Sequence, residues 1–305
     1  MKIFSKDSLD EFLVALVDER NCRLQHFKLN DSSLQQINAG SFNYSNHEDL
    51  TSQFIDWVRS NGIKDADCRW ILSRNLYQTY QIDPPNVLPK EMDEAIKWQI
   101  KDLLEYPIDQ SLVTHYQPAY KEVQSEQIVA VATGKDLVES IIEACHKTGL
   151  TFTSIDIEEL TIGHALGDSV NESQLIGFIG EDVSGLVFNF YQSGGLAFTR
   201  HKKGKFLPNS HNQEFSLEQE QEAEQESFLL ETQRTLDYVV SQIFRRPIDK
   251  ILLQENSKED AKLAEVIRQI TELEVNLVSS PVTADNQELT HPMLSEVGAA
   301  MRGTH

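Results

Sequence analysis

The chain has 305 residues, of which 40% are apolar, so it is long enough to bury one large core or two moderate ones. Its 48 acidic and 27 basic residues give a net charge of -21, which repels phosphate backbones and anionic lipid headgroups and so disfavours nucleic-acid binding. The three cysteines are far apart and form no Cys-x-x-Cys pair, which suits buried thiols in a reducing compartment better than a disulfide framework.

We expect no part of the sequence to enter a membrane. Residues 1–10 carry charges throughout and no apolar run, so no secretory signal is predicted. Elsewhere the longest apolar stretch falls far short of the roughly 18 residues that mark a membrane-spanning helix. Any membrane role would therefore depend on a partner protein.

The chain is predicted to open with a β-hairpin followed by a helix. The apolar run at residues 12–17 is typical of a buried strand, and the mixed run at residues 22–29 is typical of its partner. Apolar residues then recur at helical spacing between residues 50 and 58. Gly62 is well placed to end that helix, because glycine adopts positive φ freely.

A separate small unit is predicted after residues 83–85, where Asp-Pro-Pro forces an extended chain. The patterns that follow are a helix at 90–105, strands at 112–116 and 127–133, and a helix at 135–147. This order indicates a small α+β insert at about residues 80–152.

The second half repeats the hairpin. Residues 175–190 and 196–200 predict two strands around the turn Gln192-Ser193-Gly194-Gly195, whose residues tolerate positive φ. Residues 208–226 are rich in Glu, Gln and Asn and predict a mobile surface loop. Further patterns indicate helices at 229–243, 263–270 and 292–301 and a short strand at 251–253. Hairpins followed by helices in both halves indicate an α/β fold with internal pseudo-symmetry.

Five segments, in order along the chain, resemble motifs of PilM-type type IV pilus assembly proteins. Residues 92–100, MDEAIKWQI, resemble "ELxxAIRWEI", and residues 104–108, LEYPI, are similar to the aromatic-proline exit after that helix. The other three are SIDIEEL at 154–160, similar to "xVDVExxA", LLETQRTLDY at 229–238, similar to "LLxEIQRSLDYY", and EVGAAMR at 296–302, similar to "AxGAALR". The length and the "QRxLDY" variant are most similar to the MshI group, the PilM-like proteins of the mannose-sensitive haemagglutinin (MSHA) pilus.

The resemblance implies a two-lobed, actin-like fold. The first lobe would cover residues 1–168 and include the insert, the second would cover residues 169–284, and residues 285–305 would return to the first lobe. The implied protein is a cytoplasmic scaffold at the inner membrane. It would bind the cytoplasmic N-terminal peptide of a membrane-anchored, PilN-like partner, and the cytoplasmic pilus assembly ATPase is a further candidate partner.

Trp98 and Lys97, on the predicted insert helix, are the candidate contacts for such a partner. Trp98 lies beside the apolar stripe of that helix, so it is either boundary packing or an exposed anchor for a peptide. Two other functions stay open. One is an active actin-like ATPase of the pilus platform, and the other is the cytoplasmic component of a type II secretion-like platform.

Actin-like ATPases hold phosphates in two hairpin turns, where small residues present backbone N–H groups. By the resemblance, the candidate cofactor-binding residues are Asp18 in the first turn and Gly180 and Ser184 in the second. All three are vestigial positions, because the surrounding motifs are degraded.

None of the three expected nucleotide-binding elements, the two hairpin turns and the Gly-Gly turn, keeps its family motif. In the first turn, Glu19 is added and Arg20 replaces glycine, and in the second, Phe178 replaces the acid and acids occupy residues 181–182. The third element, a Gly-Gly turn against the adenosine, falls at residues 253–256, where no glycine stands and side chains should fill the approach. The sequence therefore predicts a non-enzymatic scaffold without a cofactor, and Mg-ATP bound without turnover is the alternative.

Other chemistry is not predicted. The nine histidines are dispersed, with no H-E-x-x-H and no His/Cys cluster, so we expect no metal site. No Walker loop, G-x-S-x-G elbow or G-x-G-x-x-G follows a predicted strand.

Overall fold

The structure is a computed structural model that describes residues 10–30, 33–119, 127–170, 174–181, 185–203, 218–255, 260–280, 282–284 and 291–302. The chain divides into two compact units. Unit 1 comprises Met1–Tyr116, Gln127–Ala165 and Ser280–His305, and unit 2 comprises Gln117–Glu126 and Leu166–Ser279. The expected divisions after residues 168 and 284 therefore differ from those of the structure, which fall after residues 165 and 279.

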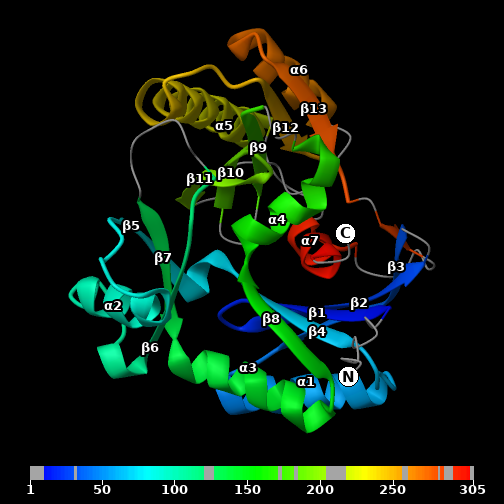
Figure 1. Cartoon of the computed structure of the whole chain (residues 1–305). Helices are drawn as coiled ribbons and strands as arrows, with labels where there is room; N and C mark the ends of the chain where they lie inside the picture. The colour runs from blue at the N-terminus through cyan, green and yellow to red at the C-terminus, as the bar shows by residue number, and fades with distance from the viewer. Residues whose placement is uncertain are drawn as a thin grey trace, which may run out of the picture. The chain divides into compact units, whose positions relative to one another are not determined.

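Unit 1 is built around a six-stranded sheet with the order β14-β3-β2-β1-β4-β8 (Figure 1). Its strands are β1 (Glu11–Val17), β2 (Asn21–Asn30), β3 (Ser33–Asn43), β4 (Asp67–Leu72), β8 (Thr151–Ile157) and β14 (Thr283–Ala284). β1 pairs antiparallel with β2 and parallel with β4, and β4 pairs parallel with β8. The apolar run at residues 12–17 forms β1 and is buried throughout, as is typical of a central strand covered on both faces.

Helices cover both faces of this sheet. α1 (His47–Ser60) and α3 (Lys135–Thr148) pack together on one face, and α7 (Leu294–Met301) packs against β1 and β4 on the other. Alternate residues of β1 divide between the two cores, with Leu13, Ala15 and Val17 on the side of α1 and α3 and Phe12, Val14 and Leu16 on the side of α7. β8 leads directly into α4 (Glu158–Leu166), which a 3-10 turn at Gly167–Ser169 follows.

Residues next to α1 and α3 in the sequence determine where these helices begin and end. The Asn46 side chain accepts a hydrogen bond from the Asp49 N–H at 2.9 Å and so caps the start of α1. Beyond its end, Gly62 has a φ of +67°, and Gly149 ends α3 with a φ of +76°. Both glycines occupy the left-handed conformation that is typical of a residue after a helix.

The insert is smaller than expected. Its sheet has the order β5-β7-β6, formed by β5 (Tyr77–Ile82), β6 (Ser111–Tyr116) and β7 (Ile128–Gly134), with 3-10 turns at Arg74–Leu76, Pro89–Glu91 and Ile108–Gln110. One helix, α2 (Met92–Gln99), packs on it through Ile96 and Ile100. Three segments that were predicted within the insert lie elsewhere. β8 is a strand of the main sheet of unit 1, α3 packs beside that sheet with α1, and Gln117–Glu126 belongs to unit 2.

The predicted insert helix at 90–105 was too long. Its apolar stripe was expected to continue to Leu103, but that side chain is 59% exposed, and α2 ends at Gln99. A helix turn without an apolar face to bury gains little from packing, so the helix ends at Gln99, next to the last core residue of the stripe, Ile100.

Unit 2 has a five-stranded sheet with the order β11-β10-β9-β12-β13. The strands are β9 (Ile176–Glu181), β10 (Gly185–Gln192), β11 (Gly195–Lys203), β12 (Lys250–Gln254) and β13 (Glu274–Val278). The stretch predicted as one strand at 175–190 therefore forms two antiparallel strands, β9 and β10. The turn predicted at Gln192-Ser193-Gly194-Gly195 joins β10 to β11, and Ser193 and Gly194 have φ values of +53° and +76°.

The helices of unit 2 begin earlier in the sequence than expected. α5 (Glu218–Tyr238) continues into a π-helix at Val239–Phe244, and α6 (Asp260–Thr271) follows β12. Residues 218–226, predicted as part of a mobile loop, form the start of α5, because Glu, Gln and Ala are strong helix formers. Residues 208–217 of that predicted loop lie outside the described residues. Within the part of the chain that is described, no helix has the length and apolar character needed to cross a bilayer.

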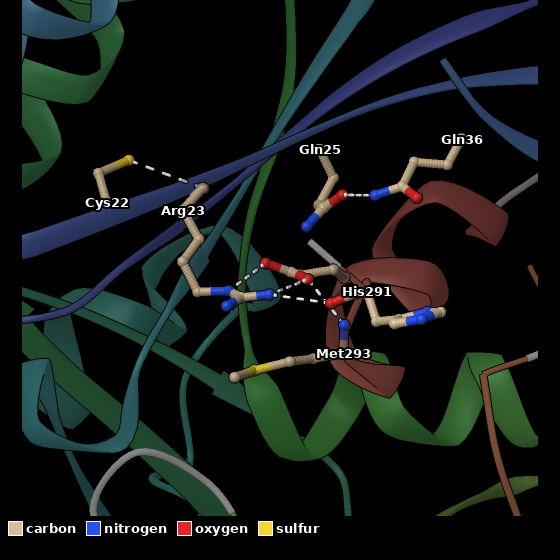
Figure 2. Close-up of polar contacts among 7 residues, drawn as sticks. Cys22, Arg23, Gln25, Gln36, His291 and Met293 are labelled. Carbon is tan, nitrogen blue, oxygen red and sulfur yellow. Dashed lines mark hydrogen bonds and ion pairs between the residues drawn. The ribbon is translucent and has the colours of Figure 1, made fainter. Parts of the chain in front are cut away.

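The N-terminal end of α7 is held to β2 by a buried ion pair (Figure 2). The Arg23 guanidinium meets both carboxylate oxygens of Glu296, with Nε to Oε1 at 3.0 Å and Nη2 to Oε2 at 3.3 Å, and it also donates to the His291 carbonyl at 3.1 Å. The Met293 N–H donates to Glu296 Oε2 at 2.7 Å. Glu296 is fully buried, so Arg23 supplies the charge that this carboxylate needs inside the protein.

The C-terminal end of α7 is held by a second arginine. Arg69 Nη1, from β4, lies 2.7 Å from the Ala299 carbonyl oxygen and 2.8 Å from those of Ala300 and Arg302. These carbonyls lack partners within the helix. Arg302 in turn pairs with Asp156 at the end of β8. Both ends of α7 are therefore fixed to the sheet of unit 1 by charged side chains.

Candidate functional site

Asp18 follows β1, and its carboxylate is engaged within unit 1. The Ser73 hydroxyl, just after β4, donates to Asp18 Oδ1 at 2.7 Å. The Asp18 N–H donates to the Asn21 carbonyl at 2.8 Å, and the Tyr44 hydroxyl donates to the Asp18 carbonyl. Because β1 and β4 are parallel neighbours, Asp18 and Ser73 meet at one edge of the sheet, and their hydrogen bond joins the two strand ends.

The turn after Asp18 presents charged side chains. Glu19 and Arg20 are both exposed, and the Arg20 carbonyl accepts a hydrogen bond from the Tyr44 N–H at 2.9 Å. A carboxylate such as Glu19 repels a phosphate unless a metal ion lies between them. This turn therefore lacks the uncharged backbone surface that a phosphate-binding hairpin provides.

A buried acid near the same strand ends was missed at the sequence level. Glu159, in the first turn of α4, is 3% exposed and lies 3.5 Å from Arg74 Nε. The Tyr77 hydroxyl donates to Glu159 Oε2. Burial, reinforced by the negative charges of Glu159 and Glu158, raises the pKa of Tyr77 well above its usual value. The sequence signal that could have identified this site is the pair of acids directly after a strand. Their carboxylates lie at the edge of the sheet that Arg74 also reaches.

In unit 2, side chains fill the space beside Gly180. Gln254, at the end of β12, extends over this glycine, and its Oε1 accepts a hydrogen bond from the Glu181 N–H at 3.3 Å. A methyl group at Gly180 would overlap Gln254 Oε1 and lie 2.8 Å from the Phe178 ring. Phe178, which replaces the acid of the family motif, is 1% exposed. Ser184 and Asn256, the other predicted positions, lie outside the described residues.

Because Gly180 has no side chain, another group can lie close to its backbone, and here a glutamine side chain of the same chain occupies that space. The Glu181 N–H, next to this glycine at the end of β9, donates to Gln254. The parallel pairing of β9 with β12 brings these residues together. Among the described residues, no group of three His, Cys, Asp or Glu side chains is placed to hold a metal ion.

Trp98 lies on the exposed side of α2. Its side chain is 56% exposed, and its indole Nε1 donates to Glu94 Oε1 at 2.9 Å, one turn earlier. Trp98 is therefore more exposed than covered, as an anchor for a peptide requires. Lys97, the other predicted contact, is half-buried beside it. The hydrogen bond to Glu94 fixes the orientation of an aromatic ring that contributes little to the insert core.

Other exposed apolar side chains gather in the insert and were not predicted. Among the described residues, eleven large apolar side chains are exposed, and six of them belong to this small subdomain. The six are Val87, Leu88, Trp98, Leu103, Tyr106 and Leu112. Single exposed apolar residues are normal, but a concentration of this kind is typical of an interaction surface. We call these six residues the insert surface. They do not all share one face, because Leu112 alternates along β6 with Val113, which packs beneath α2.

The insert surface has an acidic background. Residues 77–116 contain seven Asp or Glu and three Lys, which gives a net charge of 3 - 7 = -4. His115 Nδ1 lies 2.6 Å from Asp93 Oδ1 and ties β6 to α2. The Gln99 side chain donates to the Asp83 carbonyl at 3.2 Å and ties the end of α2 to the segment before it. The helix that carries Trp98 is therefore held in place from both ends.

Comparison with solved structures identifies the fold. The chain is similar to a protein of a PilM–PilN type IV pilus biogenesis complex, with a TM-score of 0.65, 14% identity and coverage of 95% of this chain and 96% of that one. A protein of unknown function with an actin-like ATPase fold from Bacteroides thetaiotaomicron gives 0.53, 7% identity and coverage of 99% of both chains. The cytoplasmic domain of EpsL, an inner-membrane component of the type II secretion system of Vibrio cholerae, gives 0.50, 6% identity and coverage of 97% and 95%.

No protein-family model and no curated protein matches the sequence. The structural likeness extends over nearly the whole of each of the three chains, and in each case at least 95% of both partners is covered. The predicted fold class is therefore confirmed: the chain has the α/β, actin-like ATPase fold.

Proposed function

We propose that this chain is a cytoplasmic scaffold of a type IV pilus assembly platform, and that its insert binds the cytoplasmic N-terminal peptide of a PilN-like inner-membrane protein. The observation that carries the proposal is the insert surface, with exposed Trp98 and Leu103 on an acidic subdomain. The five motif segments and the likeness to a protein of a PilM–PilN complex support the same assignment. Within that family the motif variants favour the MshI group of MSHA pilus proteins.

The charge of the insert matches the expected partner. Cytoplasmic segments next to membrane-spanning helices carry an excess of Lys and Arg. A peptide of this kind would bury apolar side chains against Trp98 and its neighbours, while its cations face the acidic residues of the insert. The protein would then be held at the inner membrane by its partner. The cytoplasmic pilus assembly ATPase is the second partner that we propose.

Replacing Trp98 with alanine is expected to weaken peptide binding by about 2 kcal/mol or more, as the loss of a central aromatic anchor does. The melting temperature should change little, because the Trp98 side chain is 56% exposed. The measurement is a calorimetric titration of the purified chain with a peptide that has the sequence of the cytoplasmic N-terminus of a PilN-like membrane protein.

Phe152→Ala is the matched control, because Phe152 is an exposed aromatic residue of β8 outside the insert, with 37% exposure. It should leave the affinity unchanged. Wild-type affinity in Trp98→Ala, Leu88→Ala and Leu103→Ala alike would show that the insert surface does not bind the peptide.

An active ATPase is the second candidate function, because the fold is that of actin-like ATPases. We expect no ATP turnover above background and no thermal shift with Mg-ATP, since Gln254 and Phe178 fill the space at Gly180. A nucleotide at about 100 times its Kd would add about 2.7 kcal/mol to the stability of the folded state. A clear rise in melting temperature with Mg-ATP would therefore favour the ATPase, and the partner peptide provides the positive control.

A type II secretion-like platform is distinguished by its partner. The likeness to the EpsL cytoplasmic domain, at a TM-score of 0.50, supports this alternative less than the likeness at 0.65 supports the pilus assignment. Capture of a pilus membrane protein by the wild-type chain, lost in Trp98→Ala and kept in Phe152→Ala, would favour the pilus. Selective capture of a secretion-system component in the same experiment would favour the alternative.

A further inference from the structure

Two cysteines that are distant in the sequence meet in the core of unit 1. Cys68 is in β4, Cys145 is near the end of α3, and their sulfur atoms lie 3.4 Å apart. Both side chains are fully buried among the residues between the sheet and the two helices α1 and α3. The Trp70 indole Nε1, on the same strand as Cys68, donates to Cys145 Sγ at 3.1 Å.

The two sulfurs are close enough to bond after a small movement. A disulfide has an S–S distance of about 2.05 Å, so the sulfurs must approach by roughly 1.3 Å, which side-chain rotation and a slight shift of α3 can supply. The third cysteine provides an internal comparison. Cys22, on β2, belongs to the same core, but the contact of its sulfur is the Arg23 carbonyl at 3.9 Å (Figure 2).

The surroundings also distinguish the roles of the two thiols. A hydrogen bond between the two thiols and one donated by the Trp70 indole lower the pKa of Cys145, against the opposing effect of burial. Burial, followed by the hydrogen bond to Cys145, raises the pKa of Cys68 well above its usual value. Burial and the charge of Glu296 raise the pKa of Cys22. Cys145 is therefore the better placed of the pair to attack, because the Trp70 indole N–H, 3.1 Å from its sulfur, stabilises the reactive thiolate.

We propose that Cys68 and Cys145 are a modification site, at which a peroxide oxidises the pair to a reversible intramolecular disulfide. The Cys145 thiolate attacks one oxygen of hydrogen peroxide, the O–O bond breaks, and the leaving hydroxide takes a proton and departs as water. The sulfur of Cys68 then loses its proton and attacks the sulfenic sulfur of Cys145. The S–O bond breaks, the S–S bond forms, and a second water leaves, so that two thiols and one peroxide give one disulfide and two waters.

A disulfide between Cys68 and Cys145 would link the two segments that connect the insert to the rest of unit 1. The chain enters the insert after β4 and returns from it through β7 into α3. A bond between Cys68 and Cys145 would therefore close a loop that contains the whole insert and would fix the two segments from which it extends. The burial of both sulfurs restricts the reaction to a small oxidant, and it makes the oxidation slower than that of a surface thiol.

The test is peptide mapping of the full chain after exposure to hydrogen peroxide under native conditions, followed by quenching, denaturation and alkylation. We expect the peptides of Cys68 and Cys145 to be joined, with Cys22 alkylated, and dithiothreitol to restore three free thiols. The oxidised protein should melt about 5 °C or more above the reduced one, because the bond constrains the unfolded chain.

Variants separate the roles of the two cysteines. Cys22→Ala should form the disulfide as the wild type does. Cys68→Ala keeps the Trp70 donor to Cys145 and should stop at a sulfenic acid on Cys145, which dimedone traps. Cys145→Ala should keep its remaining thiols reduced. The proposal is wrong if the wild-type protein retains three thiols in excess peroxide, or if the bond formed involves Cys22. The wild-type map decides this even where a variant does not fold, and neither outcome depends on the proposed pilus function.

Discussion

Replacing Gly298 with alanine is expected to destabilise unit 1 by about 2–3 kcal/mol, although alanine is the better helix former by about 1 kcal/mol. Gly298 lies in α7, where the helix crosses α4 (Figure 1). A methyl group there would overlap the Thr161 carbonyl oxygen and lie 2.7 Å from the Thr161 carbonyl carbon and 3.0 Å from the Ala165 nitrogen. These are backbone atoms, so the contact cannot be relieved by a side-chain rotation.

The measurement is urea unfolding followed by circular dichroism. Gly134→Ala is the matched control, because Gly134 has an ordinary φ of -66°, and a methyl group there would lie 3.5 Å from the Tyr106 ring, a normal contact. Gly134 is also the N-cap of α3, where alanine is slightly less favourable than glycine, so the control should cost no more than about 1 kcal/mol. Wild-type stability in Gly298→Ala would mean that α7 and α4 do not need to approach this closely.

Replacing Arg23 with methionine is expected to cost about 3–5 kcal/mol of stability, because it leaves the fully buried Glu296 carboxylate without its cation. The remaining polar contact of the carboxylate in this cluster, the Met293 N–H, is too weak a donor to replace a guanidinium. The free energy of unfolding in urea at pH 7 measures the loss.

A second substitution tests the cause. Arg23→Met combined with Glu296→Gln should be more stable than Arg23→Met alone, because the amide carries no charge and still accepts from Met293. If the double variant is no more stable than the single one, or if Arg23→Met costs less than about 1 kcal/mol, the ion pair is not what holds the start of α7.

Elements with strong local patterns could be predicted from the sequence. The run at 12–17 is apolar throughout because β1 is covered on both faces, and the stops at Gly62 and Gly149 follow from backbone conformation alone. β3 (Ser33–Asn43) was not predicted, because its sequence SLQQINAGSFN is mostly polar and only two of its residues are buried. Pairing with β2 along ten residue pairs stabilises it instead, and that contribution is not visible in a hydrophobic pattern.

The sequence indicated which residues belong to the candidate site, but it could not indicate which residues they contact. Spacing placed Trp98 beside the apolar stripe of its helix and left its exposure open, because that depends on where α2 packs on the insert sheet. The approach of Gln254 to Gly180 depends on the pairing of β9 with β12 across more than seventy residues. The Arg23–Glu296 pair joins residues 273 positions apart, and no local signal indicates such a partner.

The location of α7 in unit 1 has a consequence for synthesis of the chain. The strands that α7 covers, β1 and β4, belong to the first quarter of the sequence, while Leu294–Met301 is translated after the main segment of unit 2. Translation proceeds at about 5–20 residues per second, so the roughly 220 residues between β4 and α7 take about 10–45 s. During that time Phe12, Val14 and Leu16 lack their helix. The nascent chain on the ribosome therefore exposes an apolar sheet face that chaperones can bind, and unit 1 completes its fold only after release of α7 from the exit tunnel.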